Sequence, residues 1–208
     1  MSNFINEIQE KMADKSYSAK DLLRGAKILA SKLGLKDMEE WIEYELDGYP
    51  SDATLPTYRK DLPAQIIYFN PYLGWKPVVF DEEKMADLME HLDARFSMSE
   101  IETITERKDE PVIFNLPTSI SSTLRKQTNM NTEFAQQTSK IYFIKITDAV
   151  KTKLLDWVLM LGKNGVIGED LSFLPDEKKK AKEPSKKIIN NIFAGDKSKI
   201  DITQSEQN

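Results

Sequence analysis

The sequence predicts an α+β fold: an amino-terminal helical hairpin packed with a small antiparallel sheet and a long core helix, plus a short β-rich carboxy-terminal tail. Three observations predict this fold. Apolar residues recur at helical spacing through residues 3–48, β-branched and aromatic segments flank a turn within 65–80, and an apolar stripe at helical spacing runs through 147–161. Helices and strands therefore occupy separate stretches of the chain, which is typical of the α+β class.

The first fifty residues predict three short helices. Ser18 is a good N-cap for the second of them, and Asp21 can complete a capping box. Gly34 supplies the left-handed position that ends it, and a third helix runs from about Asp37 to Gly48. Two capped helices joined by a tight turn form an αα-hairpin. The first helix rests on apolar residues at helical spacing, namely Phe4, Ile5, Ile8 and Met12.

The middle of the chain predicts a hairpin and several shorter elements. Gln65–Phe69 is expected as a strand, and Trp75–Phe80 returns as its partner after an Asn-Pro turn. Thr147 is expected to cap a long core helix that carries Trp157 and ends near Leu161. The remaining expected elements are a helix at 82–96, a helix from Ser97 or Ser99, a strand within 111–117, a helix at 118–127 and a strand at 140–146.

We expect three regions: a globular domain at 1–174, a Lys-rich helix or linker at 175–187, and a short β-forming tail at 188–208. The linker is expected to bend at Pro184. A lone hairpin is marginal in water, so the tail would gain stability by pairing with its own domain or with another chain. The tail is therefore a candidate for self-association, and a homo-oligomer is expected.

The composition limits the chemistry. The chain has 208 residues, no cysteine and a net charge of −5. Disulfides, thiolate nucleophiles and cysteine-held metal centres are excluded, and no pattern indicates a cofactor or a metal site. No run of about 18 apolar residues occurs, and the amino terminus lacks the pattern of a secretory signal. We expect a cytoplasmic protein with no membrane partner.

A distinctive string closes the third helix, Trp41-Ile-Glu-Tyr-Glu-Leu-Asp-Gly-Tyr-Pro50, and Leu55-Pro-Thr-Tyr-Arg59 follows it. With the Leu22–Ala30 helix and Gly165-Val-Ile-Gly-Glu169, this string resembles the AbiTii domain of bacterial abortive-infection proteins over residues 1 to about 183. The resemblance implies a role in defence against phage but no established reaction, so no catalytic residue is carried over. The motif positions are Trp41, Glu45, Gly48, Tyr49, Pro50, Tyr58 and Arg59.

Chemistry, if present, is expected near the same motif. The candidate catalytic residues are Glu43, Glu45, Asp47, Tyr58 and Arg59. A solvated acidic face explains Glu43 and Asp47 more simply, and a structural pair of Glu45 with Arg59 is favoured over a catalytic role. The single histidine, His91, has no patterned partner and is interpreted as a surface residue.

The Lys-rich region contains six lysines and three carboxylates, which give it a local charge of +3. They are candidates for contact with nucleic-acid phosphates, although the solvated face of a helix is the favoured interpretation. The six are Lys178, Lys179, Lys180, Lys182, Lys186 and Lys187.

Two functional hypotheses follow. The leading hypothesis is an antiphage defence protein that acts as a self-associating sensor or partner-binding module, with a phage-derived trigger or a partner effector protein as its ligand. The alternative is an enzymatic toxin, either a nuclease or a nucleotide-directed activity. An enzyme should have a vacant pocket at Glu45, Tyr58 and Arg59, whereas a binding module should have these groups satisfied and an apolar patch exposed elsewhere.

Overall fold

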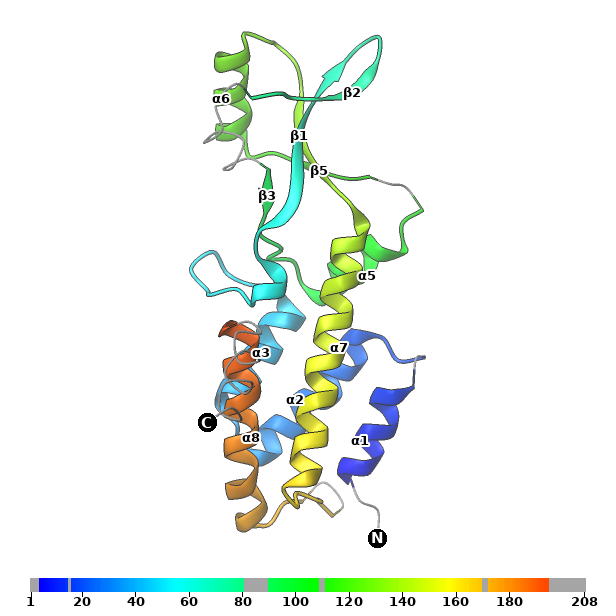
Figure 1. The fold of residues 1–208 in the computed structure, drawn as a ribbon, viewed down its shortest axis with the longest axis vertical. Coiled ribbons are helices and arrows are strands. Elements are labelled where there is room, and N and C mark those ends of the chain that lie inside the picture. Colours follow the sequence, from blue (N-terminus) through cyan, green and yellow to red (C-terminus); the bar gives the residue numbers. More distant parts are fainter. Residues whose placement is uncertain (1–3, 15, 81–89, 109–110, 170–171, 195–208) are drawn as a thin grey trace, which may run out of the picture. The chain divides into compact units, whose positions relative to one another are not determined.

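The computed structural model describes residues 4–14, 16–80, 90–108, 111–169 and 172–194. The described chain forms a helical unit and a sheet unit (Figure 1). The helical unit comprises residues up to 58, 95–102 and those from 145 onward, and the sheet unit comprises 59–94 and 103–144. The expected α+β class is confirmed.

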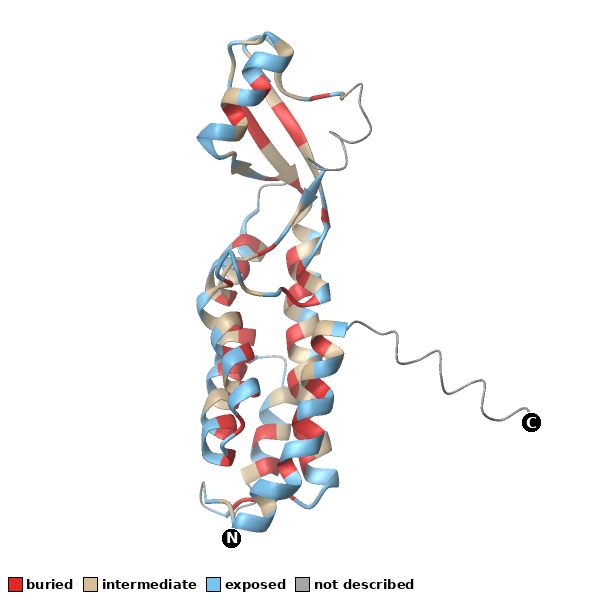
Figure 2. Cartoon of the chain, turned by 90° about the vertical axis from the view of Figure 1, so that its left-hand side faces the viewer, coloured by how far each residue is buried: buried red, intermediate tan, exposed pale blue. Residues whose placement is uncertain are grey.

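The amino-terminal helices agree with the sequence. They are α1 (Phe4–Ala13), α2 (Ala19–Leu33) and α3 (Lys36–Asp47). The Ser18 hydroxyl accepts the Asp21 N–H at 3.1 Å, which caps α2. Gly34 ends α2 with φ of +70°, and its N–H returns to the last turn of that helix. The buried residues of α2 recur at helical spacing and lie on one stripe, as the sequence predicts. Figure 2 shows buried and exposed residues on different faces of the helices.

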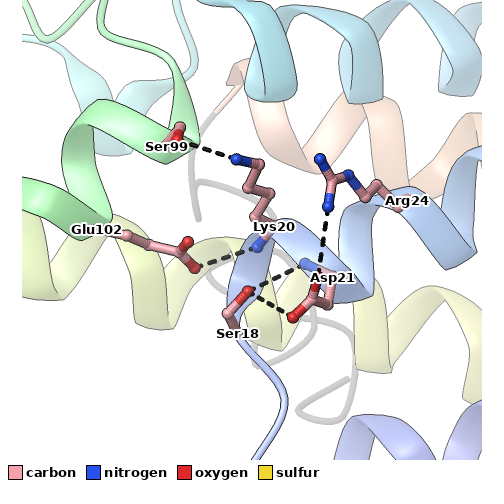
Figure 3. A network of polar contacts seen from close by, with 6 residues as sticks. All are labelled: Ser18, Lys20, Asp21, Arg24, Ser99 and Glu102. Atoms are coloured by element: carbon pink, nitrogen blue, oxygen red, sulfur yellow. Dashed lines mark hydrogen bonds and ion pairs between the residues drawn. The ribbon is translucent and has the colours of Figure 1, made fainter.

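A polar network fixes the start of α2 against α5 (Met98–Glu106), the helix expected from Ser97 or Ser99 (Figure 3). The Lys20 N–H donates to the Glu102 carboxylate at 3.1 Å, and its ammonium donates to the Ser99 hydroxyl at 3.0 Å. Lys20 thus connects the first turn of α2 to α5 through both its backbone and its side chain.

The long core helix is longer than expected. Helix α7 spans Lys140–Lys163 in one run, so the strand predicted at 140–146 and the cap predicted at Thr147 are wrong. The β-branched residues of 140–146 favour a strand locally, but the buried positions continue a single helical stripe, and tertiary packing overrides a weak preference. That stripe comprises Phe143, Ile146, Val150, Leu154, Trp157 and Leu161.

Helix α8 spans Pro175–Ala194, so the first residues of the predicted β-forming tail are helical. Residues 188–193 are helical, not a strand, because Ile188 and Ile192 continue a buried stripe that begins at Ala181. Pro184 lies inside this helix and is buried, so the helix continues through the position where a hinge was predicted. The predicted strand at 199–203 lies outside the described residues.

Side-chain hydrogen bonds join α7, α8 and the loop between them. The Trp157 indole N–H donates to the Ser185 hydroxyl at 2.8 Å, and that hydroxyl donates to the Ala181 carbonyl. Glu177, in the first turn of α8, accepts the N–H groups of Ile167, Gly168 and Leu174 at 2.8–3.0 Å. Burial alone would raise the pKa of Glu177, but these bonds hold it below the ordinary value.

The sheet unit is antiparallel throughout its described strands. They are β1 (Leu62–Asn70), β2 (Gly74–Pro77), β3 (His91–Leu92), β4 (Val112–Asn115) and β5 (Phe134–Thr138). The order is β2-β1-β5-β4, and β3 pairs with the start of β1. The predicted hairpin is confirmed, with Phe69 opposite Trp75. Helix α6 (Thr118–Thr128) packs Leu124 against Ile66, Val78 and Phe134.

One prediction for the sheet unit fails, and one strand was not predicted. The helix expected at 82–96 lies partly outside the described residues, and within them His91–Leu92 is a strand. Strand β5, with the sequence Phe-Ala-Gln-Gln-Thr, lacks the β-branched composition by which strands are found. Both segments are strands because they pair with β1 over long sequence separations.

Candidate functional site: a buried cluster and its surroundings

The family-motif residues form a buried hydrogen-bonded cluster in the helical unit. The Glu45 side chain is 0% exposed, and its Oε1 accepts the Tyr49 hydroxyl at 2.8 Å and the Tyr58 hydroxyl at 2.7 Å. The Tyr58 oxygen in turn accepts the Trp41 indole N–H at 3.1 Å. These four residues, Trp41, Glu45, Tyr49 and Tyr58, are called the motif cluster below.

Local structure explains how the cluster is assembled. Trp41 and Glu45 are four residues apart and lie on the buried face of α3 with Met38 and Ile42. A short 3₁₀ helix, Thr57–Arg59, places Tyr58. The cluster therefore draws on one helix face and on the turn that follows it.

Gly48 fixes the position of Tyr49 by allowing two backbone segments to approach closely. Its φ is +95°, and a Cβ atom there would lie 2.9 Å from the Arg95 carbonyl oxygen and 3.3 Å from the Ser97 nitrogen. The next N–H, that of Tyr49, donates to the same Arg95 carbonyl at 2.9 Å. Both the backbone angle and the close approach thus require glycine at position 48.

Arg95 is a structural residue that the sequence did not reveal. Its guanidinium donates to the carbonyl of Pro50 and, at 3.2 Å, to that of Ala53, so it holds the loop after α3. The contact spans more than forty residues of sequence, and Arg95 falls in a segment expected to be helical. No local pattern could have identified it.

Arg59 is also fully buried, at 0% exposure, in the sheet unit. Its Nη1 donates to the Ala94 carbonyl at 2.8 Å, and its own carbonyl accepts the Ala94 N–H at 2.8 Å. These bonds attach the residue to the segment that follows β3. The pairing of Arg59 with Glu45 remains a prediction.

The carboxylates of α3 do not converge. Glu43 and Asp47 are exposed, whereas Glu45 points into the core. Glu43 forms an ion pair with Lys27 of α2 at 3.0 Å. Among the residues that the structure describes, no group of three or more acidic or histidine side chains is placed to hold a metal ion.

A groove of about 320 Å³ lies beside the motif cluster, between α3 and the end of α8. It is called the α3–α8 groove, and its walls include Asp37, Glu40, Trp41, Tyr44, Ile189 and Phe193. The Tyr44 hydroxyl donates to Glu40 at 3.2 Å, and this bond raises the pKa of Tyr44. Trp41 belongs to both features, because it lines the groove and its indole N–H donates within the motif cluster.

The six candidate lysines of α8, at positions 178, 179, 180, 182, 186 and 187, are all exposed. Lys182 and Lys186 line a second cavity of about 330 Å³, together with Lys36, Asp37 and Glu183. Lys179 pairs with Asp176 at 3.7 Å. The lysines thus share their surroundings with carboxylates, which weakens the phosphate attraction of this face.

An apolar hairpin tip projects from the sheet unit. Tyr72 is 94% exposed and Leu73 is 66% exposed. The turn that carries them is ordered by Asn70, whose Oδ1 accepts their N–H groups at 2.9 and 3.1 Å. On the two strands that flank this turn, the rings of Phe69 and Trp75 contact each other edge to face, with their centroids 5.5 Å apart. We call Phe69, Tyr72, Leu73 and Trp75 the hairpin tip.

Comparison with known proteins gives a family match. The AbiTii family model matches residues 3–186. No curated protein and no solved structure matches the chain. No helix in the described part of the chain is both long enough and apolar enough to cross a bilayer. The match includes the whole motif cluster and most of α8, and the chain therefore belongs to the AbiTii family, whose name denotes abortive infection, a bacterial defence against phage.

Proposed function

We propose that this chain serves antiphage defence in the cytoplasm as a binding module that self-associates and responds to a phage-derived trigger or restrains a partner effector protein. The observation that carries the proposal is the closed state of the motif cluster. Glu45 already accepts two hydroxyl groups, and within the described residues every buried side-chain nitrogen or oxygen has a hydrogen-bond partner. Buried polar groups in that state stabilise a fold and leave no donor or acceptor for a substrate.

The enzymatic-toxin alternative requires a cavity that reaches the candidate catalytic groups. The α3–α8 groove is lined by Trp41 and Tyr44, and its walls do not include Glu45 or Tyr58. A binding role is therefore favoured over catalysis at the motif.

The exposed hairpin tip also supports a binding role. Because its turn is already ordered by hydrogen bonds to Asn70, its backbone loses less conformational entropy when a partner covers it. Tyrosine, tryptophan and phenylalanine are the side chains that contribute most to protein interfaces. The hairpin tip is the proposed contact for the trigger or partner effector.

The proposal is tested by phage challenge of cells that carry variants, with protein abundance measured in parallel. Tyr72→Ser with Leu73→Ser should abolish protection at normal abundance, because it removes apolar contact area and leaves the core intact. Ile28→Ser with Leu174→Ser is the matched control, since these residues are 52% and 69% exposed and lie in the helical unit. Loss of protection in Glu45→Gln or Arg59→Lys at normal abundance would instead favour the enzymatic toxin.

The nucleic-acid interpretation is tested separately. Changing the six α8 lysines to glutamine should leave protection unchanged if they form only a solvated face. Salt-sensitive retention on heparin that disappears in the same variant would instead support phosphate contact.

A further inference from the structure

Helix α8 ends beside the α3–α8 groove. Phe193 lines the groove, and α8 ends one residue later at Ala194. Residues 195–208 follow and lie outside the described part of the chain. We propose that residues 197–202 of one copy bind the α3–α8 groove of a second copy, and that the reciprocal contact closes a dimer. This inference rests on the proposed self-association and assigns it a surface.

The chemistry of the segment matches that of the groove. Residues 197–202 read Lys-Ser-Lys-Ile-Asp-Ile, with two lysines, two isoleucines and the carboxylate of Asp201, for a net charge of +1. The groove offers two exposed carboxylates, Asp37 and Glu40, and apolar walls from Tyr44, Ile189 and Phe193. An extended segment would direct Ile200 and Ile202 to one side, into the groove, and Lys197 and Lys199 to the other. The long, flexible lysine side chains would then remain outside the groove and pair with the exposed carboxylates of Asp37 and Glu40.

The size of the groove limits what it accepts. At about 320 Å³ it is at the small end of the range for ligand sites, roughly 300–1,000 Å³, and accepts a few side chains rather than a folded domain. A short segment is therefore a better occupant than a globular partner.

A second copy is a better source of the segment than the same chain. Only Gly195 and Asp196 lie between the end of α8 and Lys197, so binding within one chain requires a reversal directly at the helix terminus. Exchange between two copies requires no such reversal. It also gives two identical contacts related by a two-fold axis, which closes the assembly at two chains. The first contact raises the effective concentration for the second, so two weak contacts can give a stable dimer.

Trp41 connects the groove to the motif cluster. It lines the groove, and its indole N–H donates to Tyr58, which donates to Glu45. A bound segment therefore changes the surroundings of a residue that belongs to the buried cluster, and the intrinsic tryptophan fluorescence of the chain should change on binding through the contribution of Trp41.

The test uses full-length variants with reversed charge. The groove variant is Asp37→Lys with Glu40→Lys, and the segment variant is Lys197→Glu with Lys199→Glu. Matched controls carry the same charge changes elsewhere: Glu7→Lys with Glu10→Lys on α1, and Lys178→Glu with Lys187→Glu on α8, all at exposed positions. Light scattering over a concentration series should give a dimer for wild type and for both controls. Each reversed variant alone should dimerise at least ten-fold more weakly.

Mixing the two reversed variants distinguishes the outcomes. If the contact joins two copies, the mixture should recover the dimer, because each groove then meets a segment of opposite charge, and the intrinsic tryptophan fluorescence should return to the wild-type value. Failure of the mixture to recover the dimer overturns the inference. Reversed variants that dimerise as well as wild type overturn this surface but leave the proposed self-association standing. A wild-type monomer at every concentration overturns both.

Discussion

Removal of the Glu45 carboxylate should strongly destabilise the helical unit. In Glu45→Ala the hydroxyls of Tyr49 and Tyr58 both lose their acceptor inside the core. A buried donor left without a partner costs about 1–3 kcal/mol, so the expected loss in unfolding free energy for the two hydroxyls is about 2–6 kcal/mol. Native domains are stable by only about 5–15 kcal/mol, so a loss of this size should lower the midpoint of urea unfolding strongly.

Tyr49→Phe, Tyr58→Phe and the double variant show whether the loss comes from these two bonds. Each single change removes one bond to Glu45 and leaves the other in place, so each should cost about 1–3 kcal/mol. Tyr58→Phe should cost more than Tyr49→Phe, because it also removes the acceptor of the Trp41 N–H. In the Glu45→Ala background Tyr49→Phe should cost much less, because its acceptor is already absent, whereas Tyr58→Phe should still cost the bond to Trp41. The reasoning fails if Glu45→Ala costs less than about 1 kcal/mol, or if the tyrosine changes cost the same in both backgrounds.

Three further predictions concern the surrounding structure. Gly48→Ala should lower the thermal midpoint, since a Cβ would meet the Arg95 carbonyl at 2.9 Å; a midpoint equal to wild type would contradict the close approach. Ser185→Ala leaves the buried Trp157 N–H without its acceptor and should cost about 1–3 kcal/mol in urea unfolding, whereas Ser185→Thr should retain most of that stability. Because the pKa of Glu177 is lowered in the fold, its stabilisation is present above the ordinary value of 4.5 and is lost as pH falls through the folded pKa. Glu177→Gln should therefore differ from wild type in stability at pH 7 and converge with it in acid, and a difference independent of pH would contradict this.

The sequence predicted those elements whose signals are local. Ser18 and Gly34 mark the two ends of α2 through side-chain and backbone preferences that act within a few residues. The Asn-Pro turn after β1 likewise predicts the hairpin, because turn chemistry and strand composition agree there. Burial of Trp41 and Trp157 also follows from helical spacing alone.

The sequence failed where distant partners decide the structure. Residues 140–146 and 188–193 have β-branched composition, but each extends the buried stripe of a helix already in place. Arg95 and β5 could not be predicted for a different reason. Neither carries a local sequence signal, and their positions are set by partners far along the chain. Spacing over a dozen residues would have corrected the two helices, whereas Arg95 and β5 require the tertiary fold.

The motif by which the family is identified and the surfaces proposed to carry function are different parts of the molecule. Trp41, Glu45, Gly48 and Tyr49 are accounted for by burial, hydrogen bonding and one backbone angle, so they specify how α3 ends. The hairpin tip and the exposed residues of the α3–α8 groove contribute little to the core and offer apolar or charged groups instead. Trp41 belongs to both the motif and the groove, so a partner in the groove can act on the buried cluster through this one residue.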